Sequence, residues 1–241
     1  MMKIKKKFNY FIGVLIAVLL FPTFLVTSIE LVTYNKGFFI QQYEKLNTAA
    51  EIGMSQSDLL RVTWELIDYI KDDRESLDNI DAEIKGEIRP VFNSREKAHM
   101  VDVKKLFNFG FTIRNYSVLG IILLSIILFF NCKRRPIFYF ASSYLSALAI
   151  LLVLLGVLFA LIQSNFTYYW DQFHYLFFDN DLWLLDPKTD IMIMMVPEPF
   201  FFSAVTRVIA YFSAGSVFIG ALSFWIIKNA KGRTNQKKSR L

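Results

Sequence analysis

Cysteine is almost missing from this sequence, and so are the short motifs typical of common catalytic sites. The 241 residues contain one cysteine, Cys132, which excludes an internal disulfide and any metal site built from several cysteines. The chain has no GxSxG elbow, P-loop, HExxH pair or dinucleotide-binding fingerprint. The enzyme classes that depend on these motifs are disfavoured, and we expect no cofactor. The net charge of +6 would suit nucleic acid only if the basic residues formed one binding face, and they do not.

Charged residues are rare in four long apolar stretches, although 20% of the whole chain is charged. The chain is 54% hydrophobic and contains 25 phenylalanines, which argues against a soluble domain. Each stretch has the roughly 20 apolar residues that cross a bilayer. They are residues 8–28, 112–130, 137–162 and 201–227. We therefore predict an α-helical integral membrane protein with four transmembrane helices. Few ionisable residues lie in the middle of these stretches, which argues against a transporter.

The basic residues gather on one side of this pattern. They precede the first stretch, separate the second from the third, and follow the fourth: Lys3, Lys5, Lys6, Lys7, Lys133, Arg134, Arg135, Lys228, Lys231, Arg233, Lys237, Lys238 and Arg240. By contrast, residues 164–199 carry one basic side chain and six acidic ones. Because basic loops stay in the cytoplasm, we expect both termini to be cytoplasmic and residues 29–111 and 164–200 to be extracellular.

This topology divides the chain into five parts. Residues 1–28 are the cytoplasmic N-terminus and first span, and residues 29–111 form an extracellular cap. Residues 112–163 hold the second and third spans with their short cytoplasmic loop. Residues 164–200 are an aromatic-rich extracellular loop that completes the cap, and residues 201–241 are the fourth span and a basic cytoplasmic tail. In an alternative reading the first stretch is a signal peptide cleaved after Ser28, but it is longer than the usual apolar region of such peptides, so we favour its retention.

The cap contains recognisable helix signals. Ser55 and Asp58 form a capping box, followed by apolar residues at helical spacing, so we predict a helix over residues 56–71. A second helix should begin at Asn93 or Ser94 and run into the second span. The charged segment 72–85 should be a surface loop. Residues 33–40 and 89–92 are apolar enough for short strands or for loops against the membrane, and periodicity does not decide between these.

The extracellular loop is unusually aromatic, with seven aromatic residues among the 11 from Tyr168 to Phe178. An aromatic belt at the membrane interface is one interpretation. The other is a cavity with aromatic walls for an acyl chain or another apolar substrate. The candidate wall residues are Tyr168, Tyr169, Trp170, Phe173, Tyr175 and Trp183.

Both histidines of the chain should lie outside, near the membrane surface. His99 is on the helix that leads into the second span, and His174 is in the aromatic segment. Asp102 follows His99 by three residues and Asp171 precedes His174 by three, so each carboxylate could orient an imidazole if both segments are helical. The alternative is that each histidine is only a polar interfacial residue. A zinc site is not expected, because no metal-binding spacing is present.

The order of these features resembles the lipoprotein intramolecular transacylase (Lit) family of low-GC Gram-positive bacteria. The likeness runs from the first span through the fourth and is carried by the segments SREKAHMVDVKKLF (94–107), FHYLFFDNDLW (173–183) and DPKTDIMIMMVPEPFF (186–201). The resemblance implies a cell-membrane acyltransferase. Such an enzyme moves the sn-2 acyl chain of a diacylglyceryl lipoprotein to the α-amino group of its own N-terminal cysteine, which leaves a lyso-form lipoprotein. It also implies that His99 and His174 are the catalytic pair and that the aromatic cluster folds the substrate.

The chemistry of the residues suits this reaction. An amine that attacks an ester must lose a proton and the leaving glycerol oxygen must gain one, and histidine serves both steps. Ester to amide is downhill, so no nucleotide is required. Which histidine is base and which is acid stays open at this point. The alternative function is that of a non-catalytic membrane protein whose cap binds a lipid or a partner protein.

Overall fold

The structure, a computed structural model, describes residues 2–132 and 135–238 and divides into two units. The membrane unit comprises Met1–Ser28, Phe111–Ser164 and Val208–Leu241, and the site unit comprises Ile29–Gly110 and Asn165–Arg207. Of the basic residues used above to orient the chain, Lys133, Arg134 and Arg240 lie outside the described residues.

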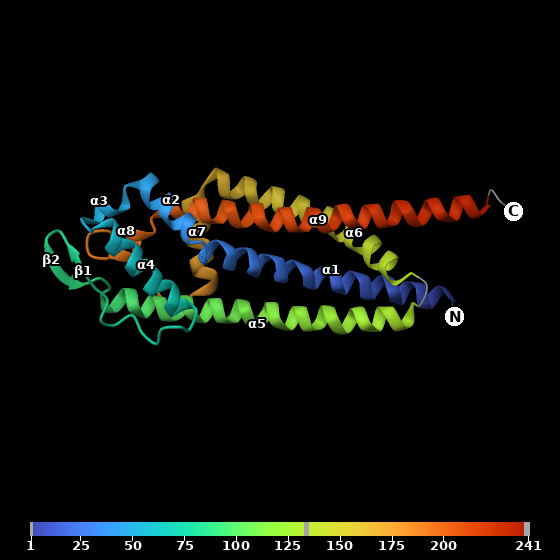
Figure 1. The fold of residues 1–241 in the computed structure, drawn as a ribbon, viewed down its shortest axis with the longest axis horizontal. Helices are drawn as coiled ribbons and strands as arrows, with labels where there is room; N and C mark the ends of the chain where they lie inside the picture. The colour runs from blue at the N-terminus through green and yellow to red at the C-terminus, as the bar shows by residue number, and fades with distance from the viewer. Residues whose placement is uncertain (1, 133–134, 239–241) are drawn as a thin grey trace. The chain divides into compact units, whose positions relative to one another are not determined.

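Four long helices account for the apolar stretches of the sequence. They are α1 (Met2–Thr33), α5 (Ser94–Asn131), α6 (Pro136–Ser164) and α9 (Glu198–Lys238) (Figure 1). Each contains one predicted stretch, and each is long and apolar enough to cross a membrane. The prediction of an α-helical, multi-pass membrane protein is confirmed.

Small residues and buried hydroxyl groups hold the membrane unit together. A Cβ atom added at Gly13 would lie 2.7 Å from the Ser143 Oγ atom, so the glycine lets α1 and α6 approach closely. The Ser143 hydroxyl donates to the Tyr10 carbonyl at 3.0 Å, and the fully buried Tyr144 donates to the Ser216 carbonyl at 2.9 Å. Such contacts are the usual adhesive between membrane helices, since lipid supplies no hydrophobic drive for their association.

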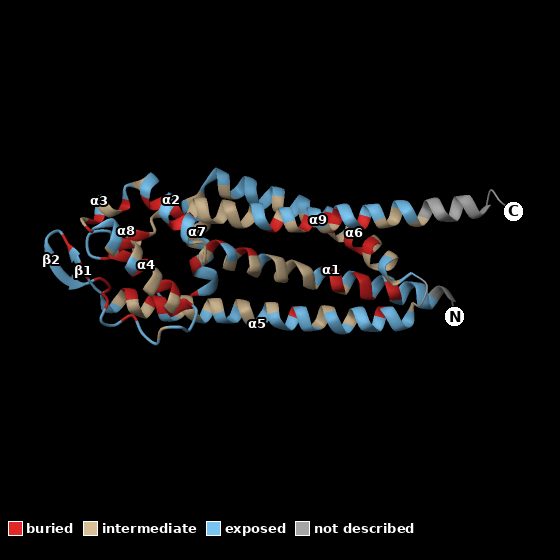
Figure 2. Ribbon diagram, in the orientation of Figure 1, coloured by how far each residue is buried: buried red, intermediate tan, exposed pale blue. Residues whose placement is uncertain are grey.

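The outer faces of the membrane unit are apolar. On α6 the side chains of Ile150, Val153 and Leu154 are each more than half exposed, and Figure 2 shows long exposed stretches on α5 and α6. An exposed apolar surface of this extent is unfavourable in water and suits contact with lipid chains.

The site unit contains the short elements. They are α2 (Lys36–Leu46), α3 (Thr48–Ile52), α4 (Gln56–Ile70), β1 (Asp81–Ile84), β2 (Glu87–Pro90), α7 (Phe166–Phe177) and α8 (Ile191–Met195). The strands form an antiparallel hairpin in which Ile84 pairs with Glu87. Aromatic side chains from α2 and the start of α9 form part of its core. Phe38 and Phe39 each lie 5.2 Å from Phe200, and the Tyr43 hydroxyl shares a hydrogen bond of 2.8 Å with Thr63 of α4.

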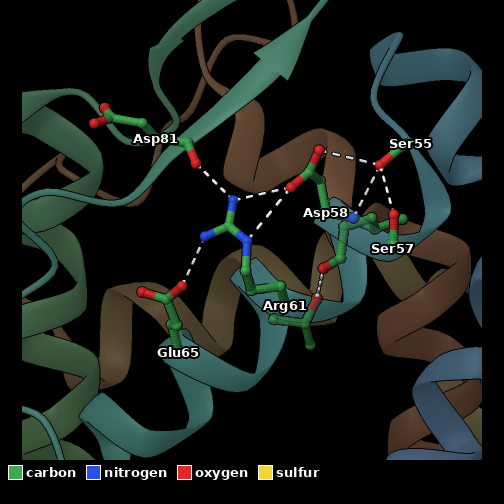
Figure 3. A network of polar contacts seen from close by, with 8 residues as sticks. Ser55, Ser57, Asp58, Arg61, Glu65 and Asp81 are labelled. Carbon is green, nitrogen blue, oxygen red and sulfur yellow. Dashed lines mark hydrogen bonds and ion pairs between the residues drawn. The ribbon is translucent and has the colours of Figure 1, made fainter.

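The predicted helix over 56–71 is confirmed as α4, and its capping box is confirmed in part. The Ser55 Oγ atom accepts a hydrogen bond from the Asp58 N–H at 3.0 Å, but the Asp58 carboxylate accepts from the Ser55 hydroxyl and from Arg61 (Figure 3). Arg61 also pairs with Glu65 at 2.8 Å and donates to the Asp81 carbonyl at 2.6 Å. This guanidinium thereby ties β1 to the exposed face of α4.

Three other local expectations had different outcomes. The prediction for residues 33–40 is wrong, because this segment is the end of α1 and the start of α2, whose first turn is capped by the Asn35 side chain. The strand alternative for 89–92 is confirmed at Arg89 and Pro90, which belong to β2. The predicted surface loop 72–85 ends earlier than expected, because residues 81–84 form β1.

Candidate active site

The helix that carries His99 begins with a firm cap. The Asn93 Oδ1 atom accepts hydrogen bonds from the Arg95 and Glu96 N–H groups at 2.9 and 3.1 Å. In return, the Glu96 carboxylate accepts from the Asn93 N–H at 2.7 Å. This reciprocal arrangement is a capping box, which satisfies backbone donors that a helix start leaves free. It fixes the start of α5 five residues before His99, where the sequence predicted the helix to begin.

The same carboxylate joins α5 to α8. Glu96 is fully buried, and its Oε1 atom accepts a hydrogen bond from the Met192 N–H at 2.7 Å. Beside it, the Asn93 amide donates to Asp190 at 2.7 Å. Burial raises the pKa of Glu96, and the N–H groups that it accepts oppose that rise. Sequence reasoning missed Glu96; the spacing of Asn93 and Glu96 is a capping pattern and could have revealed part of its role.

The second histidine lies on α7. The Asn165 side chain caps this helix by accepting from the Tyr168 N–H at 3.1 Å. The His174 Nδ1 atom lies 2.8 Å from the Trp170 carbonyl oxygen, one turn earlier. A carbonyl oxygen only accepts hydrogen bonds, so Nδ1 carries the proton in that bond. In the neutral ring the free electron pair is therefore on Nε2.

The two histidines come together although they are 75 positions apart. Their ring centroids are 6.4 Å apart, and the side chains are buried, with 8% of His99 and 7% of His174 exposed. Phe178 contacts both rings, at 5.5 Å from His99 and 5.7 Å from His174. Two groups that can exchange protons thus share one enclosed, mainly apolar site.

Four of the six aromatic candidates contact His174 or its neighbours directly. Trp183 stacks on His174 at 4.6 Å, Trp170 meets it edge-on at 4.8 Å, and Phe173 lies 5.5 Å away. Tyr175 contacts Trp183 at 5.1 Å. The ring contact of Tyr168 is with Tyr169, at 5.0 Å.

The two candidate orienting carboxylates do not hydrogen-bond to a histidine in the part of the chain that the structure describes. Asp102 accepts from Asn180 at 2.9 Å and pairs with Lys105 at 3.0 Å, while His99 Nδ1 has no hydrogen-bond partner among the described residues. Asp171 influences His174 through its charge alone. The hydrogen bond that orients the His174 ring comes from the Trp170 carbonyl instead.

Both imidazoles are held in the neutral form. His99 lies before the apolar stretch of α5, which begins at Thr112. Burial, followed by the nearby His174, lowers the pKa of His99 from 6.5 to about 4. Burial also lowers the pKa of His174, against the raising effects of the Trp170 carbonyl and Asp171. At neutral pH each ring therefore offers one N–H and one free electron pair.

The loop after α7 is tied to the face of α5 that carries His99. Asn180 binds Asp102, and the Arg95 guanidinium contacts the Asp181 carbonyl and, at 3.4 Å, its carboxylate. Arg95 and Asp102 lie four residues before and three after His99, hence on the same helix face. Among residues 2–132 and 135–238, no group of three or more His, Cys, Asp or Glu side chains is placed to hold a metal ion.

This geometry can be compared with known proteins. The family model described as "Lipoprotein intramolecular transacylase Lit" matches residues 14–201. The fold is similar to that of the membrane integral lipoprotein intramolecular transacylase Lit from Bacillus cereus, with a TM-score of 0.72 and 19% identity over 93% of this chain and 98% of that chain.

Two further structures of the Bacillus cereus protein carry a histidine replaced by arginine or by alanine. They match with TM-scores of 0.72 and 0.70 and identities of 18% and 19%. The first match covers 96% of this chain and 97% of that one, and the second covers 95% and 98%. A comparison with curated protein sequences found no match. The segment matched by the family model includes both histidines and every other candidate residue of the site.

Proposed function

This chain belongs to the lipoprotein intramolecular transacylase family and is an acyltransferase of the membrane, and we propose that His99 and His174 are its catalytic pair. In this proposal the enzyme moves the sn-2 acyl chain of a diacylglyceryl lipoprotein to the α-amino group of the N-terminal cysteine of the same lipoprotein. The product is an N-acylated, lyso-form lipoprotein. Since the family is one of enzymes, the non-catalytic alternative loses its support.

The observation that carries the proposal is the buried pair of imidazoles, 6.4 Å apart, on two different helices. His174 is the general base, because its Nδ1–H is engaged by the Trp170 carbonyl and Nε2 is left with the free electron pair. The free α-amino group has a pKa of about 8, so it is partly neutral near neutral pH, and the base takes its remaining surplus proton as the bond to carbon forms.

His99 is the partner that serves the leaving group. As the bond between the acyl carbon and the glycerol oxygen breaks, that oxygen gains a negative charge and must take up a proton. The neutral imidazole of His99 can donate a hydrogen bond to this oxygen and then transfer the proton itself. The proton that His174 took from the amine then passes to His99, so both rings return to the neutral form. The reaction consumes one ester and forms one amide, so it requires no external oxidant, and because it is downhill it requires no nucleotide.

The substrate is a lipoprotein in the membrane, with membrane lipids as its surroundings. Both the amine and the ester belong to one molecule, so the principal task of the enzyme is to fold the linker between them into an attack geometry. Orientation of this kind can supply roughly 7–11 kcal/mol of the barrier. The rigid rings around His174 are suited to hold the acyl chain during that step.

We place the site on the extracellular side of a bacterial cell membrane. The support is the distribution of charge: residues 164–199 are acidic, whereas the start of α1 and the end of α9 are rich in lysine and arginine. This side is also where a lipoprotein anchored in the outer leaflet presents its N-terminal cysteine.

The test is mass spectrometry of the N-terminal peptide of a lipoprotein. The chain would be expressed in a host that makes diacylglyceryl lipoproteins, beside the variants His174→Ala and His99→Ala. We expect an acyl chain on the cysteine amine and a mono-acylated glycerol with the intact enzyme only. A diacylglyceryl peptide with a free amine, despite good membrane expression of the enzyme, would refute the proposed reaction. Normal product from both variants would refute the histidine mechanism alone.

A further inference from the structure

We infer that Trp183 is a third catalytic residue, whose indole N–H donates a hydrogen bond to the ester carbonyl oxygen as that oxygen becomes negatively charged. This inference rests on the proposed function, since it assigns a role within the same acyl transfer. Neither the histidine pair nor the candidate carboxylates supply this hydrogen bond.

The first observation is an unsatisfied donor. Trp183 is 9% exposed, and its Nε1 atom is enclosed without a hydrogen-bond partner among the described residues. Buried indole N–H groups normally find an acceptor, because leaving such a donor unpaired costs free energy. An unpaired donor at a site of chemistry is explained when its acceptor is part of the substrate.

The second observation is the position of this ring. Trp183 stacks on the proposed base, His174, with centroids 4.6 Å apart and planes 19° from parallel, and Tyr175 meets it edge-on at 5.1 Å. The N–H of the indole and the free electron pair of the imidazole lie in these two nearly parallel planes. The indole that carries the unpaired N–H is therefore the direct neighbour of the imidazole that takes the proton of the attacking amine.

The third observation is that the segment carrying Trp183 is fixed before any substrate binds. The Leu182 N–H donates to the Asn180 side chain at 3.0 Å, and Asn180 itself binds Asp102 of α5. Arg95 holds Asp181, so both anchors come from the helix of His99. A donor held in place in this way needs no rearrangement as charge develops, which is the basis of oxyanion stabilisation.

The reaction needs such a donor. When the amine nitrogen attacks, the carbon–nitrogen bond forms and the carbonyl π electrons move to oxygen. When the intermediate collapses, those electrons re-form the carbonyl and the bond to the glycerol oxygen breaks. Both proton transfers are assigned to the imidazoles, and the His174 Nδ1–H is engaged by Trp170. The charge on the former carbonyl oxygen is left for Trp183.

The test removes the N–H and keeps the ring. Purified full-length enzyme with Trp183→Phe would be compared with wild type on a diacylglyceryl lipopeptide in detergent micelles. The control is Trp64→Phe, since Trp64 lies on α4 and its ring contacts Phe39. Loss of one oxyanion donor reduces kcat by about 10²–10³-fold. We expect this loss for Trp183→Phe with KM little changed, and normal kinetics for the control.

Either of two results would overturn the inference: kcat of the variant close to that of wild type, or a raised KM with kcat unchanged, as for a residue that only lines the acyl site. If Trp183→Phe does not fold, β-(3-benzothienyl)alanine at position 183 keeps the fused ring and replaces N–H by sulfur, and the same kcat loss is expected. If wild type forms no N-acyl product, the proposed function itself fails and the inference fails with it. If wild type forms product and both replacements at position 183 match its kcat, the inference alone fails.

Discussion

The two helices that carry the histidines are held in place by different physical means. The start of α5 is anchored by directional polar bonds: the buried Glu96 accepts N–H groups from Asn93 and Met192. By contrast, α7 is held mainly by rings, as where Trp170 stacks between Phe166 and Phe173 and meets Phe201 at 4.4 Å. Removal of one partner of a buried hydrogen bond leaves the other partner unpaired, which is costly in free energy. Removal of one ring takes away only one of several aromatic contacts. The proposed base, His174, thus lies on a helix held mainly by ring contacts, and its partner, His99, lies on a helix held by directional hydrogen bonds.

The largest effect should come from replacing the histidines themselves, one on α5 and the other on α7. Replacement of His174 by alanine removes the base, and His99→Ala removes the partner; each should lower kcat by about 10²–10⁴-fold. The double variant should be little worse than either single one, because residues that act as a unit are not additive. Turnover by a coupled mass-spectrometric assay measures all three.

Independent roles would give a different pattern. If the two losses multiplied in the double variant, the histidines would not act on one proton path. If His99→Ala retained near wild-type kcat, the α5 side would be a structural support only.

Glu96→Gln should give the next largest effect, on stability instead of chemistry. Glutamine keeps one acceptor oxygen but points an NH₂ group at an N–H that the carboxylate had satisfied. A buried donor left unpaired costs about 1–3 kcal/mol of unfolding free energy. Thermal denaturation in detergent should show a clear fall in Tm, with Glu44→Gln, an exposed position on α2, as the control. Equal Tm values for both variants would contradict the view of α5 as polar-anchored.

Much of the fold followed from patterns that depend on local sequence alone. The four spans, the helix over α4 and the start of α5 were predicted because hydrophobic runs, periodicity and caps act within a few residues. The prediction for residues 33–40 was wrong because it considers only local sequence. Their apolar character comes from packing of Phe38 and Phe39 against Phe200, which lies more than 160 positions away. Such a partner cannot be seen from local periodicity.

The site was predictable in its residue types but not in its bonds. His99 and His174 stood out because they are the only histidines and fall at corresponding places in the topology. The carbonyl that orients His174 is backbone, and the anchor at Glu96 depends on Met192, so neither leaves a side-chain signal in the sequence. The interaction of Asp102 with Asn180 needed the three-dimensional path of the loop after α7.

A smaller effect should follow when that loop is released from α5. Asn180→Ala removes the donor to Asp102, and Asp102→Asn weakens the acceptor; each should lower kcat about two- to tenfold, the size of one ordinary hydrogen bond. The combined variant should match the stronger single variant, because both remove the same bond. The control is Asp72→Asn, because the Asp72 carboxylate pairs with Lys104, at another position on α5. Fully additive losses would show that the two residues act separately.

The acid side of the pH–rate profile tests the ring-lined environment of α7. Burial keeps the pKa of His174 below the ordinary 6.5, so the base stays unprotonated as pH falls through that value. The substrate amine, with a pKa of about 8, also protonates over this range. We therefore expect kcat/KM, expressed per neutral amine, to hold from pH 7 to below 6.5 and to fall only at more acidic pH. Stability should also decline towards acidic pH. The unfolded chain takes up a proton on this histidine at about pH 6.5 and the folded chain does not, so the unfolding free energy falls below that pH.

Asp171→Asn should produce the smallest change, and it separates the effect of charge on His174 from the effect of the backbone hydrogen bond. The carboxylate raises the pKa of His174 through charge, so its neutralisation should move the acid limb of kcat/KM to still lower pH. At pH 7 the base is already neutral, and the Trp170 carbonyl orients it, so the rate there should change by no more than about twofold, far below the 10²–10⁴-fold of lost acid–base catalysis. A profile measured from pH 4 to 8 on both enzymes separates the two effects. A large loss at pH 7 would instead mean that Asp171, and not the backbone of α7, aligns the imidazole in the working enzyme.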